Sequence, residues 1–530
     1  GDQQARSSAT GGRRATITVA VGIVLVAAVV ARFLAVSPLW LDEALTVNIA
    51  RLPVVDMLQA RRHDGAPPLY YLLLHGWMDM AGTGDVAVRA LSGLLAVGSL
   101  PLMWLAGRRL VAEADDDVDP DRGRRVAWAG VLLLAASPFA IRYATEARMY
   151  SLVVVLVLAG FLALDTVLHR RSVAASVVLG AVTGLLLLTH YWAFYLLAAV
   201  AALLASQWRR AEGARRALLA MAGGSLLFVP WLPSFLDQMG ATGTPWGQPP
   251  KPRAVFDIVI QFGAGLTDTA LPLGLLLYAL VALGLFGAAA GPGRVAVDLH
   301  GRPPGRKVAA AAGLTMVLAV VIGQITGSAF AIRYAAVVLP LVLLVAALGA
   351  STLVGRPGPV VVGLAVVLGF VTAIPHMAGD RTSAGRVAAA LRAEARPGDV
   401  VAYCPDQLGP SVSRVLAAGP APELVQVTFP RGTGPELVDW VDYEATNRAA
   451  ATGPFARLLL DRAGPDHSVW VVWAPAYRTF GTKCQSLLAD LRQARPDERR
   501  VVTVTTRTLE RPGLVQYPGG GQAPLPTSPP

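Results

Sequence analysis

Charged residues are scarce in this chain, since aspartate, glutamate, lysine and arginine make up only 15% of its 530 residues. An ordinary soluble domain carries about 25%. Apolar residues account for 54%, and the mean hydropathy is +0.51. This composition excludes a soluble globular protein of ordinary make-up and predicts a polytopic membrane protein.

Several sequence signals are missing altogether. There is no glycine-rich nucleotide-binding loop and no nucleic-acid-binding module, so neither a nucleotide cofactor nor nucleic acid is expected as a partner. The only two cysteines, Cys404 and Cys484, are too far apart in sequence to predict a metal site. No small-residue cleavage site follows the first apolar run, so a cleavable signal peptide is not expected.

The net charge of +11 is explained by membrane orientation rather than by nucleic acid. Arginines cluster between apolar runs, for example at 13–14, 108–109 and 209–210. Because such clusters mark cytoplasmic loops and fall here on alternate loops, they predict a cytoplasmic N-terminal tail over 1–15. We expect a multi-pass protein of the plasma (inner) membrane.

About eleven apolar runs approach the roughly twenty residues that a helix needs to cross a bilayer. Together they predict a transmembrane domain over 16–375. The spans are expected near 16–36, 86–107, 127–144, 150–168, 172–189, 191–207, 216–235, 271–290, 308–328, 333–354 and 358–375.

A first external loop, 37–85, contains two amphipathic segments. Residues 42–62 carry apolar side chains at helical spacing, which predicts one helix at the membrane surface. Residues 67–80 are apolar but too short to span, and Pro67-Pro68 would begin a second surface helix well.

Strand-like and helical segments alternate over 376–518. This alternation predicts a small extracytoplasmic α/β domain with a largely parallel sheet. The predicted strands are 400–404, 424–429, 469–473 and 501–506, and the predicted helices are 385–395, 435–448, 455–463 and 484–494. The Gly/Pro-rich tail, 519–530, is expected to be disordered.

Both cysteines belong to this domain. Cys404 ends the first predicted strand and Cys484 begins a helix after the third, positions that can meet at one edge of a parallel sheet. An oxidising exterior makes a disulfide the candidate pairing. Two unpaired buried thiols are the alternative, because geometry decides between them.

Four motifs gather on the predicted outer side. They are Leu41-Asp42-Glu43-Ala44, Asp64-Gly65-Ala66-Pro67-Pro68-Leu69-Tyr70-Tyr71, Ser137-Pro138 leading to Arg142-Tyr143-Ala144-Thr145-Glu146-Ala147-Arg148-Met149-Tyr150-Ser151, and Arg333-Tyr334. In order and spacing they resemble the GT-C glycosyltransferases, in the branch of the protein mannosyltransferases and the lipid A aminoarabinose transferase. The resemblance covers about residues 15–375. Ala66 departs from it, because aminoarabinose-type members often carry a basic residue before the Pro-Pro pair.

The resemblance implies a GT-C-type fold and an inverting glycosyltransferase. Such an enzyme would move a sugar, of mannose or arabinofuranose type, from a polyprenyl-phosphate donor to an envelope glycan, lipid or protein acceptor on the outer face. A membrane transporter or flippase, and a non-catalytic subunit of a glycan assembly complex, are the alternatives. Against a transporter, the charged residues gather at one interface and no inverted repeat of broken helices is evident.

Asp42 and Glu43 are the candidate catalytic residues. Displacing a phosphate from an anomeric carbon requires a base for the acceptor hydroxyl and positive charge for the leaving phosphate. The resemblance implies Asp42 as the base, with Glu43 in support. Adjacent side chains on a helix point about 100° apart, so both need not reach one atom. An N-terminal helix cap with its first-turn acid is a compatible alternative.

His63 and Asp64 extend the candidate site. Asp42 and Asp64 could together bind a divalent cation, Mg²⁺ or Mn²⁺, which would neutralise the leaving phosphate. Asp64 and His63 could instead orient the acceptor. An ordinary turn at this position is the alternative, so the sequence leaves metal dependence open.

Arginines on the outer side are the candidate phosphate ligands. Arg142 and Glu146 are four residues apart and would share a helix face, whereas Arg148 would point nearly the opposite way. Arg148, next to Tyr150, is therefore assigned to the donor phosphate, and Arg333 is a second candidate. Snorkelling of each arginine to the membrane interface is the alternative.

His190 and Tyr191 could line an acceptor groove, because aromatic faces stack on sugars. Tyr70, Tyr143 and Tyr150, which lie in the motifs, complete the predicted substrate-binding set together with Glu146. Placement at the membrane interface is the alternative for the aromatic residues.

Overall fold

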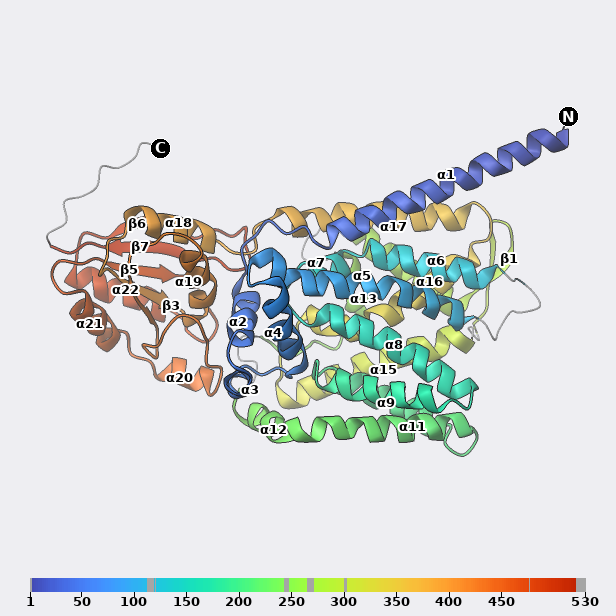
Figure 1. Cartoon of the computed structure of the whole chain (residues 1–530), viewed down its shortest axis with the longest axis horizontal. Coiled ribbons are helices and arrows are strands. Elements are labelled where there is room, and N and C mark those ends of the chain that lie inside the picture. Colours follow the sequence, from blue (N-terminus) through green and yellow to red (C-terminus); the bar gives the residue numbers. More distant parts are fainter. Residues whose placement is uncertain are drawn as a thin grey trace.

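The computed structural model of the chain describes residues 2–111, 119, 121–242, 247–264, 271–299, 303–475 and 477–520, and for residues 2–15, 264, 303 and 304 the backbone alone. A helical bundle is followed by a smaller domain built around a sheet, and the N-terminus lies at the far end of the bundle from that domain (Figure 1). Most of the tail predicted to be disordered, 521–530, lies outside the described residues.

The bundle consists of apolar helices that lie roughly side by side (Figure 1). Its elements are α1 (Asp2–Ala31), α5 (Asp85–Leu110), α6 (Arg122–Ala135), α7 (Pro138–Ala144), α8 (Tyr150–His169), α9 (Val173–Leu187), α10 (Ala193–Ala205), α11 (Glu212–Ser225), η1 (Leu226–Trp231), α12 (Leu232–Ala241), α13 (Ala254–Ala264), α14 (Leu271–Phe286), α15 (Pro303–Thr326), η3 (Ile332–Val337), α16 (Leu339–Thr352) and α17 (Pro357–Ala378).

Five helical stretches of the described chain are long and apolar enough to cross a membrane. They are α5, α8, the stretch Glu212–Ala241, α15 from Gly305 onward, and α17. α6 and α7 add a sixth if this pair, bent by 56°, is one span. Several shorter apolar helices accompany them, including α9, α10, α14 and α16. The chain is therefore mostly helical with several membrane-capable helices, while the number of eleven spans stays a prediction.

Close helix packing centres on α16, whose side chains are all buried. A Cβ atom on Gly349 of this helix would lie 1.8 Å from the carbonyl oxygen of Leu280, and one on Gly284 would lie 2.1 Å from that of Val345. Because lipid is as apolar as the side chains, small residues that let helices approach closely stabilise such bundles.

The span predicted near 271–290 is wrong at its end. α14 stops at Phe286, and the next residues form β1 (Gly287–Gly291), which pairs antiparallel with β2 (Arg294–Val297). Gly291 and Gly293 at the turn have φ values of +128° and +70°, which favour glycine. The small residues of β1 raised the apparent length of the apolar run without extending the helix.

The loop predicted to be external, 37–85, folds as three short helices, α2 (Leu41–Ala50), α3 (Val54–Arg62) and α4 (Leu69–Ala81). They lie between the bundle and the sheet domain (Figure 1). The single helix predicted over 42–62 is wrong, because Pro53 separates α2 from α3 and proline does not continue a helix. α4 lies where the second surface helix was predicted.

The second domain contains a five-stranded sheet in the order β4-β3-β5-β7-β6. Its strands are β3 (Val400–Cys404), β4 (Val425–Thr428), β5 (Val469–Trp473), β6 (Arg499–Val502) and β7 (Gly513–Tyr517). Its helices are α18 (Ala384–Glu394), η4 (Asp406–Leu408), α19 (Gly409–Ala417), α20 (Tyr443–Ala449), α21 (Thr452–Ala463) and α22 (Lys483–Ala494). Cys404 and Cys484 form a disulfide, with their Cα atoms 5.5 Å apart.

The sheet is mixed rather than largely parallel. β3 pairs parallel with β4 and β5, whereas β7 pairs antiparallel with β5 and β6. The sequence pattern did not predict β7 or α19. The helix predicted over 435–448 begins only at Tyr443. The strand predicted over 501–506 lies earlier, in β6.

Candidate active site

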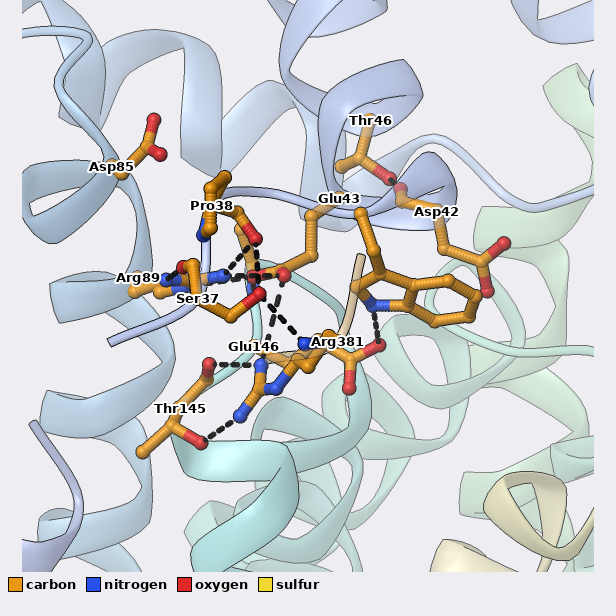
Figure 2. Close-up of polar contacts among 12 residues, drawn as sticks. Ser37, Pro38, Asp42, Glu43, Thr46, Asp85, Arg89, Thr145, Glu146 and Arg381 are labelled. Atoms are coloured by element: carbon orange, nitrogen blue, oxygen red, sulfur yellow. Dashed lines mark hydrogen bonds and ion pairs between the residues drawn. The ribbon is translucent and has the colours of Figure 1, made fainter. Parts of the chain in front are cut away.

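Glu43 of α2 lies at the centre of a buried ion-pair cluster. Its side chain is 0% exposed. Arg89 of α5 donates hydrogen bonds from Nε to Oε1 and from Nη2 to Oε2, each 2.7 Å long. The backbone amide of Ala147 donates to Oε1 at 3.0 Å, and Nη1 of Arg381 lies 3.6 Å from Oε2 (Figure 2). Both carboxylate oxygens are thus engaged, so Glu43 is suited to positioning rather than to proton transfer.

The two arginines around Glu43 also bind the neighbouring backbone. Nη1 of Arg89 donates to the carbonyl oxygen of Ser37 at 2.7 Å. Arg381 donates to the carbonyl oxygen of Thr145 at 2.7 Å and to its hydroxyl oxygen at 2.6 Å. Burial raises the pKa of Glu43, but the charges of Arg89 and Arg381 outweigh burial and the net pKa lies below the ordinary value. The cluster ties α2, α5, the loop after α7 and the start of the sheet domain to one another.

Asp42 points away from Glu43 (Figure 2). Its Oδ2 lies 3.1 Å from Nη1 of Arg333 in η3. The side chains of Asp42 and Arg333 are 16% and 19% exposed, whereas the side chain of Glu43 is fully buried. The Arg333 guanidinium also lies 5.8 Å from the ring centre of Trp40. Asp42 is therefore the accessible member of the acidic pair.

A cavity of about 300 Å³ is lined by Arg333 and extends into the bundle. Its polar lining residues are Arg142, Tyr143, Glu146, Gln261, Arg333 and His376. Nη1 of Arg142 and Nε2 of His376 are buried and have no hydrogen-bond partner in the described part of the chain. Since buried polar groups are almost always paired, these two nitrogens are candidates to bind a ligand in the cavity. The guanidinium groups of Arg142 and Arg333 both line the cavity, and guanidinium groups suit a phosphate ligand.

Glu146 joins two walls of this cavity. Nη2 of Arg142 lies 3.3 Å from Oε2 of Glu146, and Nε1 of Trp40 donates to Oε1 at 3.2 Å. The expected pair of Arg142 and Glu146 is therefore present, although α7 ends at Ala144 and the two residues do not share a helix.

Arg148 belongs to a separate hydrogen-bond chain. Its Nη1 donates to Oγ1 of Thr46 at 2.8 Å and to the hydroxyl of Tyr71 at 3.4 Å. The hydroxyl of Tyr71 donates to Oδ2 of Asp64 at 2.9 Å, and Arg61 donates to the same oxygen. Arg148 is not a lining residue of the cavity, so the geometry does not favour the phosphate role predicted for it. It links the loop before α8 to α2 and α4.

The remaining predicted tyrosines and His190 form buried contacts. The hydroxyl of Tyr70 lies 2.8 Å from Oγ of Ser92, which in turn donates to the carbonyl oxygen of Arg148. The rings of Tyr143 and Tyr150 are 4.7 Å apart, and those of Tyr150 and His190 are 5.8 Å apart. Of these residues Tyr143 lines the cavity, while Tyr70, Tyr150 and His190 do not.

His63 and Tyr191 lie away from the cavity. Nδ1 of His63 is 2.9 Å from Oδ1 of Asp439 in the sheet domain. The hydroxyl of Tyr191 donates to Gln238 and accepts a hydrogen bond from Nε1 of Trp231 at 3.1 Å. The structure therefore does not bring these two residues together with Asp42.

The sheet domain reaches the beginning of α2. The buried carboxyl of Glu510 accepts hydrogen bonds from Oγ of Ser411, at 2.9 Å, and from the backbone amide of Leu41. Its neighbour Leu509 lines the cavity. A carboxylate at a helix N-terminus stabilises the unpaired N–H groups there, so the domain helps to fix the helix that carries Asp42.

No protein-family model matches this sequence, and no curated protein matches it. Solved structures do. The crystal structure of ArnT from Cupriavidus metallidurans in the apo state aligns with a TM-score of 0.60 and 16% identity, over 97% of this chain and 100% of that chain. The same protein bound to undecaprenyl phosphate aligns with a TM-score of 0.57 and 14% identity, over 97% and 99% of the two chains.

The chain has the GT-C fold. Because nearly the full length of both chains aligns, the likeness extends over the bundle and the sheet domain alike. The GT-C resemblance inferred from the four motifs is thus confirmed at the level of the fold.

Within this GT-C fold, Asp42 and Asp64 do not fit a shared divalent-cation site. Asp42 is paired with Arg333, and Asp64 is paired with Arg61. In the described part of the chain, no three His, Cys, Asp or Glu side chains are grouped to hold a metal ion. Divalent cations such as Mg²⁺ take several oxygen ligands. Positive charge at the cavity comes from arginines instead.

Sequence reasoning missed Arg89, Arg381, His376 and Gln261. His376 directly follows the last predicted span, 358–375, and Arg89 lies within the span predicted near 86–107. An ionisable residue in a span or at its end is a signal for a functional site. No local signal indicated that Arg89 and Arg381 would meet Glu43, because each comes from a different element far along the chain.

Proposed function

We propose that this chain is an inverting glycosyltransferase that moves a sugar from a polyprenyl-phosphate donor to a cell-envelope acceptor on the outer face of the membrane. The proposal is based on the arrangement around Asp42. The accessible carboxylate of Asp42 is paired with Arg333, which lines a cavity where Arg142 and His376 present unpartnered nitrogens. ArnT bound to undecaprenyl phosphate supports a lipid-phosphate ligand for this fold.

In the proposed reaction Asp42 accepts the proton of the acceptor hydroxyl. The hydroxyl oxygen forms a bond to the anomeric carbon, and the bond from that carbon to the phosphate oxygen breaks. The electron pair of the broken bond leaves with the polyprenyl phosphate. A single displacement of this kind inverts the configuration of the anomeric carbon.

The phosphate oxygens are held by Arg142 and His376, and Arg333 adds a second guanidinium at the same cavity. Preorganised positive charge in a site from which water is largely excluded stabilises the charge that develops on the leaving group. Glu43 and Glu146 position the site: Glu43 through Arg89, and Glu146 through Trp40 and Arg142. The transferred sugar is of mannose or arabinofuranose type in this proposal, and the N-terminus is cytoplasmic.

Transfer by the purified full chain tests the proposal. The chain is mixed with radiolabelled polyprenyl-phosphate mannose or polyprenyl-phosphate arabinofuranose and with an envelope extract as acceptor. Wild-type protein is expected to release polyprenyl phosphate and a labelled product, and Asp42→Asn is expected to lose both while eluting as the same folded species. Full transfer by Asp42→Asn would show that Asp42 is not the base. Movement of labelled lipid across vesicles without product indicates a flippase instead.

A further inference from the structure

A second cavity, of about 400 Å³, lies between the first external loop and the sheet domain. Ile49, Ala60 and His63 form its wall on the side of α2 and α3. Asp406 and the segment 431–439 form the opposite wall. It shares no lining residue with the cavity of the proposed donor site. Its volume falls within the range of small-molecule sites in proteins.

The lining of this second cavity is acidic. Its carboxyl groups belong to Asp406, Glu436 and Asp439, and its basic groups belong to Arg431 and His63. Both basic groups are engaged by Asp439: Arg431 donates to Oδ2, and Nδ1 of His63 lies 2.9 Å from Oδ1. Asp439 therefore offsets the charge of Arg431, and the exposed carboxylate of Glu436 repels an anionic ligand.

The same walls combine hydrogen-bond acceptors with apolar surface. Glu436, an exposed residue, and Thr433 offer oxygen atoms, while Ile49, Leu437 and Val438 offer apolar side chains. A neutral sugar presents hydroxyl donors at its edge and C–H groups on its face. Carboxylates accept hydrogen bonds from such hydroxyls, and apolar side chains cover the ring face.

The second cavity lies along the helix that carries the proposed base. Ile49 and Asp42 are both on α2, and the seven residues from position 42 to 49 span about 10 Å. His63 directly precedes Asp64. The hydroxyl of Tyr71 donates to Asp64, and Arg148 donates both to that hydroxyl and to Thr46 of α2. A ligand in this cavity that reaches Asp42 is therefore longer than one sugar.

We infer that this cavity is an acceptor subsite for a neutral oligosaccharide whose end reaches Asp42. The inference rests on the proposed function and narrows its acceptor to an unphosphorylated glycan. A phosphorylated lipid or glycan is disfavoured, because its charge would face the carboxylate of Glu436.

Binding is best measured in the Asp42→Asn background, where turnover does not interfere. The full chain in detergent is titrated calorimetrically with neutral mannotetraose, with an arabinofuranosyl tetrasaccharide, and with mannotetraose that carries a terminal phosphate. At least one neutral tetrasaccharide is expected to bind. If neutral mannotetraose binds, phosphorylated mannotetraose is expected to bind at least about tenfold more weakly. If neutral mannotetraose does not bind, phosphorylated mannotetraose is expected not to bind either.

Two variants at exposed positions test the walls. Glu436→Gln is expected to weaken binding of the neutral oligosaccharide about tenfold, as removal of a charged hydrogen-bond acceptor does. Leu437→Ala is expected to weaken it through the lost apolar contact. Glu423→Gln, an exposed acid of the same domain that does not line the cavity, is the matched control and is expected to bind like its parent.

Three results would overturn the inference: binding of neither neutral tetrasaccharide, equal or tighter binding of the phosphorylated one, or unchanged binding in both Glu436→Gln and Leu437→Ala. Failure of the proposed function would look different. In that case wild-type protein shows no donor-dependent transfer, while the Asp42→Asn chain still binds the neutral tetrasaccharide and the cavity is a glycan-binding site without catalysis.

Discussion

Oδ2 of Asp42 lies 3.1 Å from Nη1 of Arg333, although Asp42 lies in the loop after the first apolar helix and Arg333 precedes one of the last helices of the bundle. The next residue, Glu43, is enclosed by Arg89 instead. Two adjacent acids on one helix are thus divided between two roles. Asp42 faces the reactants in the proposed reaction, and Glu43 holds the surrounding segments in place.

Replacing Arg333 is expected to impair transfer without unfolding the chain. Arg333→Gln removes the partner of Asp42 and one of the guanidinium groups that stabilise the leaving phosphate, so kcat/KM for the donor is expected to fall about a hundredfold. Arg333→Lys is expected to recover part of the loss. Steady-state kinetics provide the measurement, with Arg253→Gln, an exposed arginine outside both cavities, as the control. Unchanged kcat/KM in Arg333→Gln would show that this guanidinium is not used.

Replacing Glu43 is expected to affect stability first. Glu43→Gln leaves Arg89 buried without its countercharge, which typically costs about 3–5 kcal/mol. Thermal unfolding of the detergent-solubilised protein should show a clearly lower midpoint than wild type. Glu423→Gln, at an exposed site, should stay within about 0.5 kcal/mol of wild type. A Glu43→Gln protein as stable as wild type would mean that the cluster does not hold the fold together.

The stability of the chain is expected to fall as the pH rises toward neutrality. Burial raises the pKa of Glu510 and of Asp406 to about 7, so the folded chain binds these protons more tightly than the unfolded chain. The resulting stabilisation is complete below about pH 4 and is lost as the pH rises through 7. Glu510→Gln removes the contribution of Glu510 to the pH-dependent free energy of unfolding. That contribution is up to about 3 kcal/mol.

Thermal unfolding at pH 5 and pH 8 measures this effect. Wild type is expected to unfold at a lower temperature at pH 8, and Glu510→Gln is expected to show a smaller difference between the two values. An equal or larger difference in Glu510→Gln would assign the pH dependence to other groups.

Chelation is expected to leave transfer unchanged. Arg333 and Arg61 engage the two carboxylates that a divalent cation would need, and arginines supply positive charge at the cavity. The rate of transfer before and after extensive dialysis against EDTA is the measurement. Loss of activity that Mg²⁺ or Mn²⁺ restores would show that a cation takes part and that the arginine pairs rearrange around it.

Features that depend on local chemistry could be predicted from the sequence. Asp42 follows directly on an apolar run, Arg333 precedes another, and the order of the motifs indicated the GT-C fold. The disulfide partners could be named because only two cysteines exist. The break at Pro53 was also readable, since proline does not continue a helix, yet the amphipathic pattern of 42–62 concealed it.

Features that depend on distant segments could not be predicted. The choice of Arg148 over Arg142 assumed one continuous helix, but α7 ends at Ala144 and the loop after it turns Arg148 toward Thr46. The partners of Glu43 come from α5 and from the start of the sheet domain, and no periodicity connects them. β7 comes last in the sheet domain but inserts between β5 and β6, an order that alternation of strands and helices does not reveal.

The rate of a single turnover in Asp42→Asn measures whether the Asp42 carboxylate acts as the base. Protein in excess is loaded with a labelled polyprenyl-phosphate sugar, its donor affinity is measured, and acceptor is then added. We expect that donor affinity is not weakened while release of polyprenyl phosphate slows at least about a hundredfold, the usual contribution of a general base. Release at the wild-type rate would contradict this expectation.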